Sequence, residues 1–338
     1  METSLGPRIR LASWLLAGLA LLLIIKLHLL PALLAGLLVY ALVEALVPAL
    51  QRLLPGAHAR GLIVALLSVL VVALLTLAII GGVSFMRREL GEPGAFFESL
   101  MPLVDRARAQ LPQVVVDHLP DSIDDFRAIA IEWLRSHAAQ LQLAGKTAAR
   151  IVVHLLIGIV LGAMVALADA RRHPDARRGE LVHALVERCR NLVAAFHDIV
   201  FAQVKISAVN TLFTAIFLLI VLPLCGLPLP FAKSLVVVTF VVGLLPVVGN
   251  LISNTLIIIA GLSVSFGVAV AAFAYLVLIH KLEYFLNARI VGTQIRARAW
   301  ELLIAMLFME AAFGVAGLVA APIYYAYLKR ELSAARLI

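Results

Sequence analysis

The chain has 338 residues, of which 63% are hydrophobic and 14% charged, and its formal net charge is +8 at pH 7. A soluble globular domain carries roughly 45–50% apolar and about 25% charged residues, so this composition excludes a soluble protein. The basic excess does not indicate nucleic-acid binding, because the Lys and Arg residues lie in short clusters between apolar runs, as the positive-inside rule requires of a membrane protein.

The first apolar stretch, residues 11–50, is interrupted only by Lys26 and His28, which predict a tight turn between two membrane helices at an interface. It contains no convincing cleavage site, so we expect the first helix to be retained. Basic residues flank this pair of helices and place the N-terminus in the cytoplasm. They are Arg8, Arg10, Arg52 and Arg60. A third apolar run, residues 62–86, then leads outward.

Residues 87–148 form the longest polar region, in which acidic side chains slightly outnumber basic ones, so we expect it outside the cytoplasm. The spacing of Phe126, Ile129, Trp133 and His137 predicts an amphipathic helix, lying on the membrane or on a partner subunit. A weaker version of the same pattern covers residues 96–111. The region is expected to form a small helical cap.

A fourth span is predicted at residues 151–168, followed by a basic cytoplasmic stretch and a helix that leads into a fifth span at 206–224. Cys189 and Cys225 have a spacing that fits neither a metal site nor a disulfide framework. The sequence therefore divides into four parts: membrane helices at 1–86, the extracytoplasmic region at 87–148, the fourth span with the basic helix at 149–205, and a C-terminal transport region at 206–338.

The C-terminal part contains two interrupted apolar segments with an unbroken span, residues 268–286, between them. The first, 234–266, is broken at Leu245-Pro246-Val247-Val248-Gly249-Asn250, and the second, 300–327, at Phe313-Gly314-Val315-Ala316-Gly317. Proline removes a backbone donor and glycine loosens a helix, so both are breaks at membrane depth. Paired interrupted segments point to the binding site of a transporter, because unwound backbone supplies polar groups there.

Two arrangements of these segments remain open. If both fold back as re-entrant hairpins, Arg289, Arg296, Arg298, Lys329 and Arg330 all lie in the cytoplasm. If both are kinked full spans, the loop that contains the first three lies outside. In either case the predicted fold is an all-α, polytopic membrane protein of about eight hydrophobic segments with interrupted helices in its C-terminal half.

Polar residues beside the two breaks are the candidate site. Glu310, four residues before Gly314, is expected to bind a proton or cation, or to form a structural ion pair with Arg289 or Arg296. Neutral groups after Gly249 suit a small oxygen-rich solute or a partly dehydrated cation, or bond neighbouring helices. The candidates are Pro246, Gly249, Asn250, Ser253, Asn254, Glu310, Gly314 and Gly317, with Gln203, Asn210, Glu283 and Arg289 as second choices. No metal ligand set is predicted.

Several motifs have an order that resembles the autoinducer-2 exporter family over nearly the whole chain. They are Tyr40 to Pro48, Phe201-Ala202-Gln203, Gly226-Leu227-Pro228, residues 245–250, Asn287-Ala288-Arg289-Ile290-Val291-Gly292, and residues 313–318 with Pro322. The chain departs from that family's pattern at Ala202, Val247 and Asn250, where the family has glycine, an aromatic residue and proline.

The resemblance implies a transporter of the bacterial inner membrane. Members of the family are described as exporters of the furanone autoinducer-2, and some as sodium/proton antiporters. It also implies a homo-oligomer, such as a pentamer, and an elevator-like motion of the part that binds solute.

Together these observations predict a secondary transporter that exports a small polar solute resembling autoinducer-2. Because no Walker-type glycine loop is present, the proton gradient is the expected energy source. The alternative is a sodium (cation)/proton antiporter. Zinc-protease, nucleophile-elbow and aspartyl motifs are absent from the sequence, so neither an enzyme nor a cofactor is expected. A scaffold that recruits a partner through residues 87–148 is a further alternative; nucleic acid is not an expected partner, whereas membrane lipids are.

Overall fold

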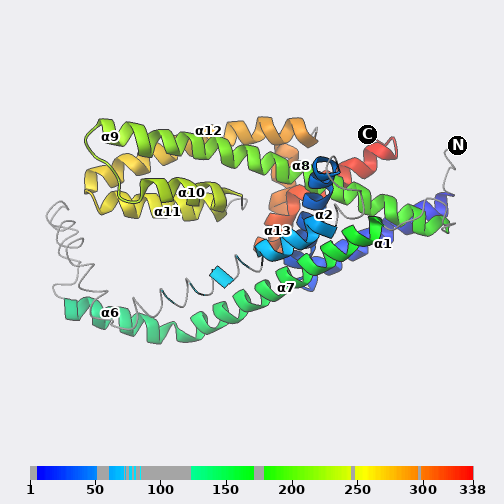
Figure 1. Ribbon diagram of the computed structural model, residues 1–338, viewed down its shortest axis with the longest axis horizontal. Coiled ribbons are helices and arrows are strands. Elements are labelled where there is room, and N and C mark those ends of the chain that lie inside the picture. Colours follow the sequence, from blue (N-terminus) through cyan, green and yellow to red (C-terminus); the bar gives the residue numbers. More distant parts are fainter. Residues whose placement is uncertain are drawn as a thin grey trace. The chain divides into compact units, whose positions relative to one another are not determined.

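The computed structural model describes residues 6–51, 61–71, 73, 76, 77, 80, 84, 123–170, 179–244, 248–295 and 298–337. Every element in this part of the chain is a helix (Figure 1). Five helices are long and apolar enough to cross a membrane, within Pro7–Lys26, Leu30–Pro48, Ala138–Asp169, Glu180–Leu224 and Trp300–Ala334. Shorter apolar helices cover Gly61–Val71, Ala232–Gly243, Gly249–Leu262 and Phe266–Lys281. With the two that flank the break at residues 245–247 taken as one, these are the predicted eight hydrophobic segments, and the all-α polytopic fold is confirmed.

The chain forms two compact units, one made of residues 1–77, 143–199 and 295–338 and the other of residues 78–142 and 200–294. In the first unit, α1 (Pro7–Lys26) and α2 (Leu30–Leu50) are joined by the predicted tight turn, where His28 has a φ of 59°. Helix α7 (Ala138–Ala170) begins in the second unit and ends in the first, and helix α8 (Glu180–Ile216) begins in the first unit and ends in the second.

Helices α2 and α7 pack through small residues and run parallel. A Cβ atom on Gly158 would lie 2.1 Å from the carbonyl oxygen of Ala32, and one on Gly162 would lie 2.3 Å from that of Gly36. One turn further on, the Tyr40 hydroxyl donates to the Asp169 carboxylate at 3.3 Å. Because the contacts advance along both helices in the same order, α2 and α7 point in the same direction.

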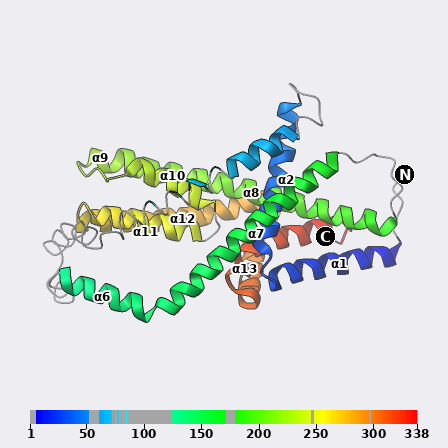
Figure 2. The ribbon, with the colours of Figure 1, turned by 60° about the horizontal axis from the view of Figure 1, so that its bottom comes forward.

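Helix α13 (Ala299–Ala334) is a helical hairpin, because its backbone leaves helical geometry at Gly314, with φ 62° and ψ −147°. The Lys329 ammonium donates to the Glu301 carboxylate at 2.9 Å across a separation of 28 residues. A straight helix would hold two such residues about 42 Å apart. The chain must therefore turn back near Gly314, as the change of direction within the orange-to-red helix in Figure 2 also shows.

The second unit contains the end of α8, a π-helical turn at Phe217–Val221, α9 (Leu222–Leu224), α10 (Ala232–Gly243), α11 (Val248–Leu262) and α12 (Phe266–Ile295). Its core includes Leu218 and Ile257, and the Phe217 ring stacks on that of Tyr275 at 3.9 Å between centroids. Helices α10 and α11 lie side by side as a second hairpin (Figures 1 and 2). Both predicted breaks thus become hairpins.

Helix α6 (Ile123–Ser136) confirms a helix in the polar region, and its Ile129 and Trp133 side chains are exposed. The weaker pattern at 96–111 lies outside the described residues. Helix α7 begins at Ala138 and α8 at Glu180, so each extends well before the apolar span predicted within it. The limits proposed at residues 148 and 205 fall inside these helices, and the four-part division stays a prediction.

Candidate functional site

One face of α8 in the second unit carries a row of polar side chains. Gln203, Ser207, Asn210 and Thr214 follow one another at spacings of four, three and four residues, which places them on one side of a helix. Ser207 and Thr214 are only 2% and 1% exposed, and Asn210 is 8% exposed. Buried polar groups need hydrogen-bond partners, and Gln203, Ser207 and Asn210 find theirs in the hairpin of α10 and α11.

The first two members of the row bind the carbonyl end of α10. The Gln203 amide donates to the Gly243 carbonyl oxygen at 2.8 Å, and the Ser207 hydroxyl donates to that of Phe240 at 2.7 Å. The last carbonyl groups of a helix have no partner within the helix. Side chains of α8 therefore bind the backbone directly before the break.

Beyond the break, Asn210 and Asn250 join α8 to α11. The Asn210 amide donates to the Asn250 side-chain oxygen at 3.3 Å, and the buried Ser253 hydroxyl donates to the Asn250 carbonyl oxygen at 3.4 Å. Asn254, one residue further, is half-buried. Gly249 lets the two hairpin arms approach, since a Cβ there would lie 2.2 Å from the Val242 carbonyl oxygen.

This hairpin site offers amides, hydroxyls and helix-end carbonyls, and none of the residues described in it is charged. Such groups can hydrogen-bond a small polar solute or coordinate a partly dehydrated cation. Six of the predicted residues lie here, namely Gln203, Asn210, Gly249, Asn250, Ser253 and Asn254. Ser207 was not among the predicted residues, although its position in the α8 row is a signal that could have found it.

The remaining predicted residues lie elsewhere. Gly314 and Gly317 form the turn of α13 in the first unit, and Glu310 is exposed on the first arm of that hairpin. Pro246 lies outside the described residues, as do the side chains of Glu283 and Arg289 and the whole of Arg296. Both ion pairs predicted for Glu310, with Arg289 and with Arg296, therefore involve side chains outside the described residues and stay predictions.

The arms of the α13 hairpin are joined by charged and polar groups that sequence reasoning missed. Glu301, at the start of the first arm, accepts hydrogen bonds from the Tyr325 hydroxyl and the Lys329 ammonium on the second. The Lys329 ammonium also lies 5.9 Å from the Tyr325 ring centroid. These contacts close the open end of the hairpin opposite Gly314.

A second missed cluster surrounds Glu331, which is 3% exposed. The Glu331 carboxylate accepts from the Trp14 indole at 3.0 Å and from the Asn191 amide at 2.9 Å, and it pairs with the Arg188 guanidinium. Arg188 also lies 5.9 Å from the Trp14 ring centroid. The cluster fixes α1, α8 and α13 to one another within the first unit.

A family model described as AI-2E family transporter matches residues 11–336 of this chain. The chain belongs to this family. The resemblance seen in the order of the motifs is thereby confirmed, and this AI-2E family member is a multi-pass membrane protein of a transporter family. Comparisons with curated proteins and with solved structures give no match.

Proposed function

We propose that this AI-2E family member exports a small polar solute resembling autoinducer-2, driven by the proton gradient, and that the solute binds at the hairpin site. The observation that carries this proposal is the row of polar side chains on α8 that binds the last carbonyl groups of α10 and the Asn250 side chain near the start of α11. A small oxygen-rich solute can exchange hydrogen bonds with such neutral groups. Transport rather than catalysis is the proposed role.

The protein is proposed to lie in the bacterial inner membrane with its N-terminus in the cytoplasm. In that topology both α2 and α7 run inward, which agrees with their parallel packing. The division into two compact units supports an elevator-like motion, because such a motion needs one unit that carries the solute and another that stays fixed. A homo-oligomer is part of the same proposal.

The direct test is uptake of labelled autoinducer-2 into inverted membrane vesicles that contain the protein, with and without an uncoupler. We expect uptake above that of empty-vector vesicles, sensitive to the uncoupler, and strongly reduced by Asn250→Ala at equal protein level. A matched control is Thr255→Ala in the same helix, since Thr255 is exposed and its hydroxyl donates to the Leu251 carbonyl of α11. Vesicles with folded protein and no uptake would exclude this solute.

The alternative function is cation/proton antiport, and the exposed position of Glu310 on an apolar helix arm favours it. Leu307 and Phe308, its neighbours on that arm, are 68% and 71% exposed. A carboxylate in such surroundings is costly in lipid and is a functional candidate by default. Glu310→Gln should abolish sodium-dependent proton movement in vesicles if the protein is an antiporter, whereas export of a neutral solute should survive the substitution.

A further inference from the structure

The turn between α9 and α10 points two large apolar side chains away from the second unit. Leu224, the last residue of α9, is 82% exposed, and Phe231, directly before α10, is 80% exposed. Between them, Leu229 is buried in the core cluster against which Val264, in the connection between α11 and α12, also packs. The two connections therefore lie at one end of the unit (Figure 1). Leu229 fixes the turn to the protein and leaves its two neighbours outside.

Phe231 keeps its exposed ring in a strained backbone conformation. Its φ of 57° and ψ of 21° lie in the left-handed region, where a bulky side chain is an outlier because its Cβ crowds the backbone. Glycine adopts this region without strain, as Gly226 does in the same turn with a φ of 76°. Strained residues concentrate where their conformation serves a function. We therefore expect the ring at position 231 to make a contact that a glycine could not make.

The turn lies at the depth of a membrane surface. Residues 206–224, which lead into it, contain no charged side chain and extend about 28 Å at 1.5 Å per residue. This is close to the thickness of a hydrocarbon core, about 30 Å. Lys205 directly before this run and Lys233 after the turn are both exposed. Long basic side chains reach the headgroup region, so the two lysines mark the two surfaces of the membrane, and the turn lies at the surface of Lys233.

The lipid interface is the environment that suits this turn. Water is unfavourable for two large apolar side chains that are exposed side by side in the sequence of one short turn. The centre of the bilayer is unfavourable for Lys233, two residues after Phe231. The boundary between headgroups and acyl chains accommodates both, since aromatic rings lie at that level and basic groups reach the phosphates.

We propose that the turn at residues 225–231 anchors the second unit in the lipid interface, with the Leu224 and Phe231 side chains at the boundary between the headgroups and the acyl chains of one leaflet. The Lys233 ammonium lies at the lipid phosphates, which phospholipids of any headgroup offer. The left-handed conformation of Phe231 directs its ring outward, while Leu229 holds the turn to the core. The anchor sets the depth of the second unit in the arrangement that the structure describes.

Fluorescence quenching of a Phe231→Trp protein in liposomes of phosphatidylethanolamine and phosphatidylglycerol measures the depth of this side chain. A Trp133→Phe/Trp300→Phe background retains only Trp14, whose emission is measured separately and subtracted. We expect strong quenching by lipids brominated close to the headgroup, weaker quenching by lipids brominated near the chain ends, and little quenching by aqueous iodide. Strongest quenching by iodide or by the chain-end bromines would overturn the proposal. Protection from all three quenchers would do so too, because protein would then cover the ring.

The native thiol of Cys225 reports on the turn as a whole, because it is exposed there and Cys189 is the only other cysteine of the chain. In Cys189→Ser protein, a nitroxide on Cys225 should collide both with oxygen, which concentrates in the bilayer, and with a nickel chelate, which stays in water. Two reference labels belong in Cys189→Ser/Cys225→Ser protein. Leu212→Cys, exposed in the middle of the α8 run, should meet oxygen, and Gln140→Cys, exposed in α7 well before its apolar run, should meet the chelate. A Cys225 label that matches either reference would contradict an interfacial turn.

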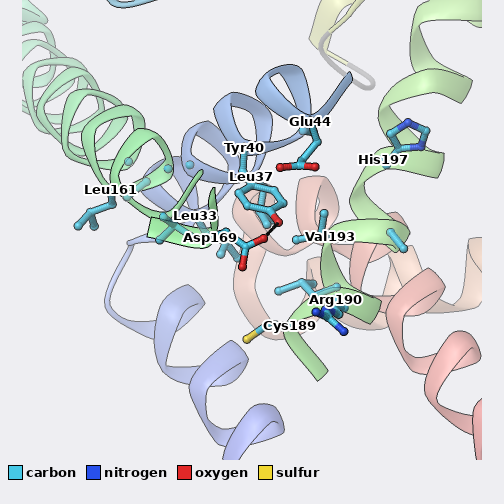
Figure 3. Close-up of a pocket in the computed structure, with 18 of the residues that line it drawn as sticks. Leu33, Leu37, Tyr40, Glu44, Leu161, Asp169, Cys189, Arg190, Val193 and His197 are labelled. Carbon is cyan, nitrogen blue, oxygen red and sulfur yellow. Dashed lines mark hydrogen bonds between the residues drawn. The ribbon is translucent and has the colours of Figure 1, made fainter. Parts of the chain in front are cut away.

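Phe231→Ala should move the Cys225 label towards water, seen as more collisions with the nickel chelate, because the anchoring ring is gone. Two control variants each remove an exposed apolar side chain elsewhere. They are Phe273→Ala in α12 and Leu161→Ala on the wall of an open cavity that α2, α7 and α8 line in the first unit (Figure 3). Neither should move the label. An unchanged label in folded Phe231→Ala protein would overturn the proposal.

Phe231→Gly separates backbone strain from anchoring, since it relieves the strain and also removes the ring. In detergent it should unfold at a higher temperature than Phe231→Ala, because glycine adopts the left-handed conformation freely. In liposomes its Cys225 label should lie as close to water as that of Phe231→Ala. Equal unfolding temperatures of the two variants would show that the backbone does not hold the ring outward, and would overturn that part of the proposal.

Discussion

Glu331 joins three helices through one carboxylate that water scarcely reaches. Trp14 and Asn191 donate hydrogen bonds to this carboxylate, and Arg188 neutralises its charge. A buried ion pair adds little net stability, because the cost of removing both charges from water offsets their attraction. Removing Glu331 alone is different, since the buried Arg188 charge is then compensated only by Glu187 at 3.2 Å.

Glu331→Gln should therefore destabilise the protein by about 1–3 kcal/mol, because the buried Arg188 guanidinium would keep only its pair with Glu187, whose side chain is 42% exposed and lies 3.2 Å away. Thermal unfolding of the purified protein in detergent measures this. Glu180→Gln, on the exposed first turn of α8, should have no effect. The double variant Arg188→Met/Glu331→Leu should recover most of the loss, and a double variant as unstable as the single one would contradict this explanation.

The Asn210–Asn250 hydrogen bond should appear as a coupling energy between α8 and α11. Hydrogen bonds between membrane helices contribute about 0.6 kcal/mol on average in double-mutant cycles. We expect a coupling of that size between Asn210→Ala and Asn250→Ala, measured by unfolding in SDS. Asn210→Ala combined with Asn254→Ala is the control cycle and should be additive. Equal couplings in the two cycles would contradict a specific contact.

At the scale of the element, the positions of the two breaks were predictable because proline and glycine mark breaks locally, whereas the hairpins were one of two arrangements that the sequence left open. The α8 row was partly predictable, since Gln203 and Asn210 are polar residues within an apolar run. Glu331 was not, because Trp14 and Asn191 are 317 and 140 residues away in the sequence. A basic stretch and an interfacial glutamate look solvated until the fold brings them together.

The turn of α13 should depend on Gly314 for its backbone conformation. Nothing lies within 4 Å of a Cβ added there, but its φ of +62° with an extended ψ is a region that side chains with a Cβ avoid. Gly314→Ala should cost about 1–3 kcal/mol of stability, measured by thermal unfolding, and should impair transport. Gly18→Ala in α1, also without a neighbour within 4 Å, should be neutral or slightly stabilising. Equal effects of the two would argue against a strained turn.

The contact between α2 and α7 should depend on Gly162 for a different reason, the lack of space. A side chain there would overlap the Gly36 carbonyl and push the helices apart, at a cost of about 1–3 kcal/mol for Gly162→Val. Thermal unfolding checks this. Gly145→Val in the same helix, where nothing lies within 4 Å, is the matched control for helix propensity. A loss no greater than that of the control would show that α2 and α7 do not touch here.

At the scale of the whole molecule, the sequence predicts the helix content and the hydrophobic segments well, since both follow from local composition. It leaves open whether the two broken segments fold back or cross. Thiol labelling resolves this at Arg298, which is exposed at the start of α13. In a Cys189→Ser/Cys225→Ser background, Arg298→Cys should react with an impermeant maleimide in inverted vesicles and not in intact cells. Two kinked full spans would reverse this result.

Reference positions fix the two sides of the membrane in that experiment. Arg8→Cys should react with the maleimide in inverted vesicles, as Arg298→Cys does. Leu27→Cys, in the exposed turn after α1, should react in intact cells instead. These controls also test the proposed cytoplasmic position of the N-terminus. Labelling of Arg8→Cys from outside the cell would reverse the whole topology.

The fold-back at Gly314 also has a consequence for the parity of membrane crossings. Two hairpins remove two crossings from the total that two full spans would give, so the number stays even or odd as before. A reporter fused to the C-terminus is therefore insensitive to the difference and reads the same side for both folds. The short connection between α12 and α13 changes side, which makes it the diagnostic position for a reporter insertion.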